Sequence, residues 1–194
     1  MKRIFKTLSK SLLILTLSTS LLSAANEIKK DNNIITSITL NNVKVGNTLF
    51  IKDNNGIILY EEFIKTTGTY RKGFDLTALP NGDYYFEIDK DVEIKMIPFT
   101  VAENKVTYKK DEESIIFKPY VNQVENMIFV SKLAPNLEPL TISIYSENTI
   151  GYELLHTEKV EGVQSIEKVY KLLEGSYKIV FNCNNKEFTK FINN

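Results

Sequence analysis

The 194-residue chain has little of the chemistry that most enzymes use, with one cysteine, one histidine and no tryptophan. A catalytic triad could be built only through His156, and the sequence has no Gly-x-Ser-x-Gly nucleophile elbow. Zinc sites take several His or Cys ligands, whereas His156 and Cys183 each stand alone. We therefore predict no enzyme activity, no cofactor and no metal site. A hydrolase with an unrecognised carboxylate site is the enzyme-class alternative.

Arginine is nearly missing, since only Arg3 and Arg71 occur. This disfavours recognition of phosphate or carboxylate groups by clustered guanidinium groups. A single cysteine also excludes an intramolecular disulfide, although an exported chain would permit one. Cys183 has the same parity as Tyr177 and Ile179, which predicts a small buried side chain on a strand.

Residues 1–25 have the pattern of a secretory signal peptide. Basic residues come first, an apolar run covers residues 11–22, and Ser23-Ala24-Ala25 forms a small-residue cleavage site. The apolar run is shorter than the ~20 residues of a membrane span, so we expect cleavage and no stable span afterwards. We predict export to the periplasm, cell surface or exterior of a Gram-negative bacterium.

The chain after the predicted cleavage site has no basic excess. Residues 1–25 hold four of the 24 basic residues and no acidic ones, which leaves 20 basic and 24 acidic residues and a formal charge of −4. Nucleic-acid binding requires a basic footprint. We therefore predict no nucleic-acid partner.

A motif of the form Leu-x-x-Gly-x-Tyr occurs twice, 93 residues apart, each time before an alternating apolar run. The glycine suits a tight corner, and the tyrosine can bury its ring while its hydroxyl bonds an upstream backbone group. This is the arrangement of the tyrosine corner in immunoglobulin-like sandwiches. The predicted structural corner residues are Leu79, Gly82, Tyr84, Leu172, Gly175 and Tyr177.

A constant shift of 93 places the apolar residues of the first half on those of the second, for example Leu49 on Ile142 and Leu76 on Val169. Short alternating segments separated by Gly, Asn and Pro turns predict strands, and 163–173 is read as a strand although its spacing also fits a helical turn. We predict an all-β chain with two tandem immunoglobulin-like β-sandwich domains, 26–103 and 114–194. The charged segment 104–113 is predicted to link them.

The segments 48–59, 74–88 and 93–95 together resemble the C-terminal sorting domains of the bacterial type IX secretion system. In that family a strand ending Asp-x-x-Gly, a Leu-x-x-Gly-x-Tyr corner and a Lys-rich final strand follow in this order. The chain is also similar to small exported Ig-like domains of unknown function. The resemblance implies a β-sandwich over residues 34–101 and, more loosely, 124–193, and a sorting-domain-like secretion module as one possible role.

We expect the chain to bind another macromolecule, either a protein or a cell-surface glycan. A protein binder should show a contiguous apolar patch or a bare sheet edge. A glycan binder should present coplanar exposed rings, whereas an enzyme should show a pocket with convergent carboxylates of perturbed pKa. The tyrosines expected to face outward, as possible glycan contacts, are Tyr60, Tyr70, Tyr85 and Tyr152.

Overall fold

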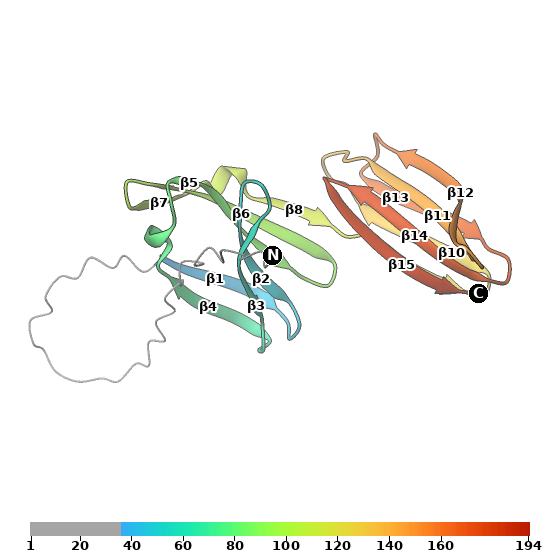
Figure 1. Cartoon of the computed structure of the whole chain (residues 1–194), viewed down its shortest axis with the longest axis horizontal. Helices are drawn as coiled ribbons and strands as arrows, with labels where there is room; N and C mark the ends of the chain where they lie inside the picture. Colours follow the sequence, from blue (N-terminus) through green and yellow to red (C-terminus); the bar gives the residue numbers. More distant parts are fainter. Residues whose placement is uncertain (1–35) are drawn as a thin grey trace, which may run out of the picture. The chain divides into compact units, whose positions relative to one another are not determined.

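The computed structural model describes residues 36–194 and is almost entirely β-structure (Figure 1). The predicted signal peptide lies outside the described residues. The chain divides into two compact units, and the described residues of unit 1 are 36–90 and 95–114. Unit 2 consists of residues 91–94 and 115–194. The all-β prediction is confirmed, and every strand pairing with a described register is antiparallel.

Unit 1 is built from a two-stranded and a larger sheet. The small sheet pairs β1 with β4, and the larger one has the order β3-β2-β5-β6-β7, with β8 also pairing β6. The strands are β1 (Thr36–Val43), β2 (Thr48–Asp53), β3 (Ile58–Phe63), β4 (Gly68–Phe74), β5 (Gly82–Asp89), β6 (Glu93–Ala102) and β7 (Lys105–Tyr108). Strand β8 (Ser114–Phe117) begins at the last residue of unit 1, and its other residues belong to unit 2. Alternate residues of both sheets, such as Leu40 and Phe86, enter one hydrophobic core, which therefore lies between the sheets.

Unit 2 has a three-stranded sheet in the order β13-β10-β9 and a four-stranded sheet in the order β12-β11-β14-β15. Its strands are β9 (Tyr120–Val124), β10 (Met127–Leu133), β11 (Leu140–Asn148), β12 (Gly151–Val160), β13 (Ser165–Lys171), β14 (Ser176–Cys183) and β15 (Lys186–Asn193). Buried side chains alternate along the strands, as in Ile142 and Ile144. The segment 163–173 contains β13 and no helix, as its reading as a strand requires.

The segment 104–113, predicted as a linker, contains regular structure. Residues 105–108 form β7, which pairs with β6 from Phe99 to Ala102, and Lys110–Glu112 form a 3-10 turn, η2. Val106 and Tyr108 pack against the core of unit 1. Val106 and Tyr108 are the apolar residues of this charged segment, and their alternation is compatible with a short last strand of the first domain.

The two units repeat the same arrangement, but no single shift in residue number relates all of their strands. Ile51 of β2 pairs with Tyr60 of β3, and Ile144 of β11 pairs with His156 of β12. Ile51 and Ile144 are 93 residues apart, so β2 and β11 are related by the shift of 93. The same pairings also show that β3 and β12 are related by a shift of 96. Unit 2 has three more residues in this hairpin and three fewer before β14. The 3-10 turn η1 (Leu76–Ala78) of unit 1 falls where unit 2 is shorter.

No helix among residues 36–194 has the length and apolar character needed to cross a membrane.

Candidate binding surface

Both predicted corners contain the same hydrogen bond. The Tyr84 hydroxyl donates to the Pro80 carbonyl at 2.8 Å, and the Tyr177 hydroxyl donates to the Leu173 carbonyl at 3.1 Å. Each bond reaches four residues back and leaves its ring buried. These contacts fasten the turn before β5 and β14, and they give the corners a structural role.

The other corner residues are not equivalent between the units. Leu172 is buried, whereas Leu79 is partly buried and packs on the core beside the fully buried Leu76 of η1. Gly175 has φ +149°, which side chains rarely adopt, but Gly82 needs no positive φ. The rings of Tyr84 and Tyr177 cover the glycine of their own corner.

An ion pair joins the two sheets of unit 1 along one open side. Glu62 of β3 accepts hydrogen bonds from Lys72 of β4 and from the Tyr60 hydroxyl. Lys72 also donates to the Tyr60 oxygen at 2.5 Å. Burial alone would raise the pKa of Glu62, but the bonds from Lys72 and Tyr60 outweigh it and lower that pKa. We call this group the edge clasp of unit 1.

Unit 2 has an edge clasp at the positions shifted by 96. Glu158 of β12 accepts hydrogen bonds from Lys168 at 2.5 Å and from the Tyr170 hydroxyl at 2.6 Å. His156 Nε2 lies 3.5 Å from the same carboxylate. The bonds from Lys168 and then Tyr170 lower the pKa of Glu158. Each clasp holds one carboxylate beside a cation, so neither forms the paired carboxylates of a hydrolase.

Two of the four tyrosines expected on the outside pack inward, against the core of unit 1. Tyr60 and Tyr70 pack against the hydrophobic core, and the Tyr60 ring makes an edge contact with Phe74 at 5.2 Å. Burial, followed by the charge of Glu62, raises the pKa of Tyr70 to about 12. A β-bulge between Ile51 and Lys52 in the β2–β3 pairing reverses the parity of β3 and turns Tyr60 inward.

The other two tyrosines lie on outer sheet faces. Tyr85 is half-buried and pairs with Lys52, whose ammonium forms a 2.8 Å ion pair with the buried Glu87. Tyr152 is 41% exposed on the outer face of the four-stranded sheet of unit 2. Tyr152 is therefore the member of the four that stands in an accessible cluster.

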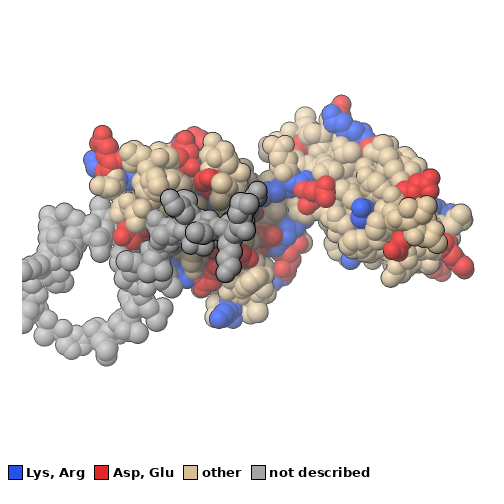
Figure 2. Space-filling model, in the orientation of Figure 1, with Lys and Arg blue, Asp and Glu red and all other residues tan. Residues whose placement is uncertain are grey.

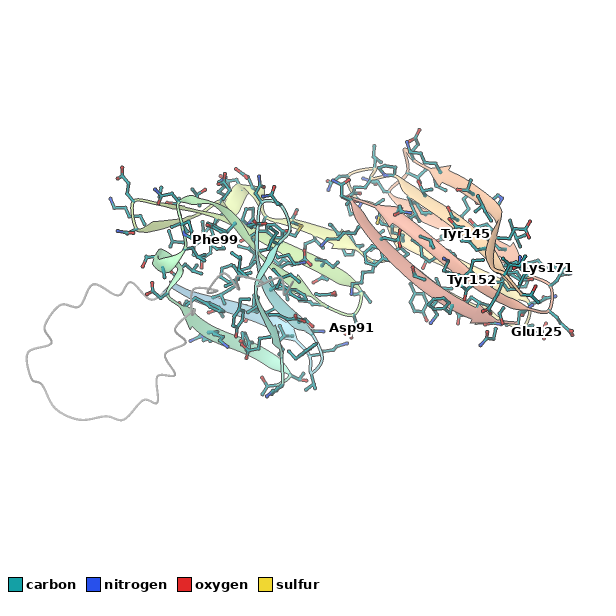
Figure 3. The ribbon with its side chains drawn as sticks, in the orientation of Figure 1. Asp91, Phe99, Glu125, Tyr145, Tyr152 and Lys171 are labelled. Carbon is teal, nitrogen blue, oxygen red and sulfur yellow. The ribbon has the colours of Figure 1, made fainter. Side chains whose placement is uncertain are left out.

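That cluster is the aromatic patch of unit 2, made of Tyr145, Tyr152, Phe191 and Lys178. The Lys178 ammonium lies 4.8 Å from the Tyr145 ring centre and 4.6 Å from that of Tyr152. Figure 3 labels Tyr145 and Tyr152 in unit 2. The Tyr152 and Phe191 rings are 6.3 Å apart, and Phe191 is 62% exposed. Four adjacent strands thus support one patch in which a cation lies over aromatic faces.

More exposed apolar side chains continue the patch along β12 and its turn. Leu154 pairs with Tyr145, and Ile150 in the β11–β12 turn is almost fully exposed. Asn148 fixes this turn by accepting the backbone N–H of Ile150 at 2.9 Å and of Gly151 at 3.0 Å. Figure 2 shows scattered charges of both signs on the viewed face of unit 2, with uncharged surface between them.

The geometry of the patch separates the candidate ligands. The Tyr152 and Phe191 rings are inclined by 49°, so they do not form the coplanar platform expected of a glycan binder. Exposed apolar side chains and strands at the sheet edges are the features expected of a protein binder. Sequence reasoning missed Tyr145 and Phe191, because these residues are far apart in the sequence and come together only through the pairing of strands.

A shallow cavity of about 290 Å³ lies at the end of this sheet. Its lining includes Cys183, Lys159 and Lys186 but no Asp, Glu or His. Burial raises the pKa of the Cys183 thiol, which favours the uncharged form. No group of three or more His, Cys, Asp or Glu side chains suited to a metal ion occurs in the described part of the chain. The cavity therefore lacks the convergent carboxylates that a hydrolase would require.

Comparisons with known proteins identify no family. No family model matches the chain, and no curated protein matches it. Among solved structures, the chain is similar to one described as "Biofilm associated protein - BSP domain", with 15% identity and a TM-score of 0.28. The match covers 83% of this chain and 27% of that one, and a score of this size does not establish a common fold. The functional argument therefore rests on the geometry of the chain itself.

Proposed function

We propose that the chain is an exported, non-enzymatic binding protein whose aromatic patch contacts a partner protein in the cell envelope or outside the cell. The observation that carries the proposal is the exposed cluster of Tyr145, Tyr152 and Phe191 around Lys178. Aromatic side chains are enriched in interface cores, and an ammonium held over their faces adds polar specificity. The signal-peptide pattern of residues 1–25 supports export.

Capture of partners from an envelope extract tests this proposal. Tagged chain starting at residue 26 would be cross-linked in an extract of the source bacterium, and bound proteins would be identified by mass spectrometry. A Tyr152→Ser and Phe191→Ser double variant removes the exposed rings of the patch. A matched control carries Ile58→Ser and Phe63→Ser, because Phe63 on β3 of unit 1 is 61% exposed, close to the value for Phe191.

The proposal predicts that the patch variant loses a specific captured protein and that the control retains it. Equal capture by both variants and the unaltered chain would overturn the proposal. Equal loss from both variants would overturn it as well, because general stickiness of exposed apolar side chains would then explain capture.

A glycan-binding role is the second candidate, supported by the exposed Tyr152 ring beside Phe191. Its support is weaker because the two rings are tilted and tryptophan is absent. An array of bacterial surface glycans, probed with the same double variant, distinguishes the two candidates. Binding that disappears with the double variant would favour the glycan role.

A further inference from the structure

The backbone of β15 has an open side whose residues can be identified from the hydrogen-bond alternation. Gly175 and Asn194 exchange both backbone hydrogen bonds, at 3.0 and 2.9 Å. Hydrogen-bonded pairs alternate along an antiparallel ladder, so the next bonded pairs are Tyr177 with Ile192 and Ile179 with Lys190. The intervening residues Glu187, Thr189 and Phe191 therefore direct their N–H and C=O groups away from β14. No strand among the described residues pairs on that side.

Unit 1 shows what occupies the corresponding edge. There β7 pairs along β6, and Lys109 N–H donates to the Pro98 carbonyl at 3.0 Å. The same alternation places the N–H groups of Thr100 and Ala102 toward β7. Unit 2 has no counterpart of β7 within the described residues, although β15 follows β14 just as β6 follows β5.

The opposite edge of the four-stranded sheet is unsuited to an added strand. β12 has a bulge between the pairs made by Ile144 and Tyr145, and a bulge interrupts the regular spacing that strand addition requires. β15 pairs with β14 without interruption over eight consecutive residues. The β12 edge of this sheet is therefore interrupted by a bulge, whereas the β15 edge is regular.

Side chains beside the open edge define the chemistry of an incoming strand. Phe191 belongs to the aromatic patch on the outer face, so an apolar side chain of the added strand would extend that patch. Lys190 is exposed and has the opposite parity, so an acidic side chain would lie beside it. A strand that alternates apolar and acidic residues satisfies both contacts.

We propose that β15 accepts an extended strand from a partner protein, in the position that β7 occupies in unit 1, with alternating apolar and acidic side chains. This inference rests on the proposed function and specifies how the partner of the aromatic patch binds. Main-chain hydrogen bonds to Glu187, Thr189 and Phe191 supply affinity, and the contacts with Phe191 and Lys190 supply specificity.

The probe is a synthetic eight-residue peptide that alternates glutamate with valine and tyrosine, titrated into the chain starting at residue 26 and followed by NMR. The backbone amides of Glu187, Thr189 and Phe191 should gain protection from hydrogen exchange. Thr189→Pro removes an outward N–H and should weaken binding about tenfold or more, whereas Thr189→Val retains that N–H and should bind within about twofold of the unaltered chain.

A second measurement leaves the protein unaltered. The same peptide with every backbone amide N-methylated cannot donate to the ladder from either edge, so it should fail to bind even if Thr189→Pro disturbs folding. Equal affinity for the methylated peptide, no binding at millimolar concentration, perturbation confined to β12, or self-association of the chain through β15 would each overturn strand addition. If partner capture still depends on Tyr152 and Phe191 in any of these cases, the proposed function stands although strand addition to β15 is wrong.

Discussion

Units 1 and 2 share the contacts that hold a sandwich together and differ in what they expose. Both fasten the corner before a central strand with a tyrosine hydroxyl, and both join their sheets with a Glu–Lys clasp ten residues apart. Unit 1 pairs β6 with β7, whereas β15 of unit 2 has an open side within the described residues. The repeated contacts thus specify the fold, and the unrepeated surface of unit 2 is the candidate for function.

The interiors also differ. Unit 1 is centred on aromatic rings, with Phe86 within 5.1 Å of Phe99 and 5.6 Å of Phe74. Leu40 of β1 pairs with Tyr70, and Lys132 of β10 pairs with Ile166 at the position shifted by 96, so Lys132 takes the position of Leu40 in unit 2. Both side chains are buried, and the Lys132 ammonium donates to the Leu133 carbonyl at 3.0 Å. A buried ammonium costs solvation that a leucine does not, so we expect unit 2 to be the less stable unit.

The largest expected effect concerns the central ring of each core. Phe86→Ala should destabilise unit 1 by about 4–5 kcal/mol, because a cavity forms and several ring contacts disappear. Phe181→Ala should cost unit 2 about 3–4 kcal/mol, since no ring pair is found for Phe181 among the described aromatic contacts. Urea unfolding, followed by NMR signals of each unit, measures both, and the reverse order would break the comparison.

The second-largest expected difference concerns the contribution of each edge clasp to the stability of its unit. Lys72→Met should cost about 2 kcal/mol, because the Lys72 side chain is 13% exposed and its loss leaves Glu62 partly buried without a cation. Lys168→Met should cost about 1 kcal/mol or less, since the Lys168 side chain is 34% exposed. Thermal unfolding of the two variants gives the comparison, and equal costs would show that burial does not set the strength of the clasp.

Acidification tests the Glu62–Lys72 ion pair, because the lowered pKa of Glu62 fixes the direction of the expected change in stability. The folded-state pKa of Glu62 is lowered, so its stabilisation is complete above the unfolded pKa of about 4.3 and disappears as pH falls through the folded pKa. Unit 1 should therefore lose stability below about pH 4. Lys72→Met should lose less over the same range, and parallel pH profiles for the two proteins would contradict the assignment.

Substitution of the two corner glycines should have different effects on stability, because their backbone conformations differ. Gly175→Ala should cost about 1–2 kcal/mol, because φ +149° is strained for any residue with a Cβ atom. Gly82→Ala should change stability by less than about 0.5 kcal/mol, since its Cβ would meet the Tyr84 ring at an ordinary 3.5 Å. Chemical denaturation of both variants checks this, with equal losses as the contrary result.

The corner hydroxyls should give the smallest and most similar effects. Tyr84→Phe and Tyr177→Phe should each cost about 1 kcal/mol, because each removes one partly buried hydrogen bond to a backbone carbonyl. Both are measured by unfolding of the unit concerned. No change for either variant would mean that its hydroxyl contributes nothing to the corner.

Sequence reasoning reached the all-β fold because alternation and turn residues are local signals. The edge clasps escaped it because Glu62 and Glu158 correspond only under a shift of 96, which three extra residues in the β11–β12 hairpin produce. Tyr60 was expected on the wrong face because a bulge, invisible in the sequence, reverses the parity of β3. The aromatic patch assembles from four strands, so no local pattern could indicate it.

Residue-by-residue amide hydrogen exchange along β6 and β15 compares the two sheet edges most directly. The account predicts slow exchange for Thr100 and Ala102, whose N–H groups bond to β7, and fast exchange for Glu187, Thr189 and Phe191 in the free chain. Protection of Glu187, Thr189 and Phe191 equal to that of their neighbours Phe188 and Lys190 would show that β15 is already covered, and would contradict the claim that unit 2 keeps an open edge for a partner.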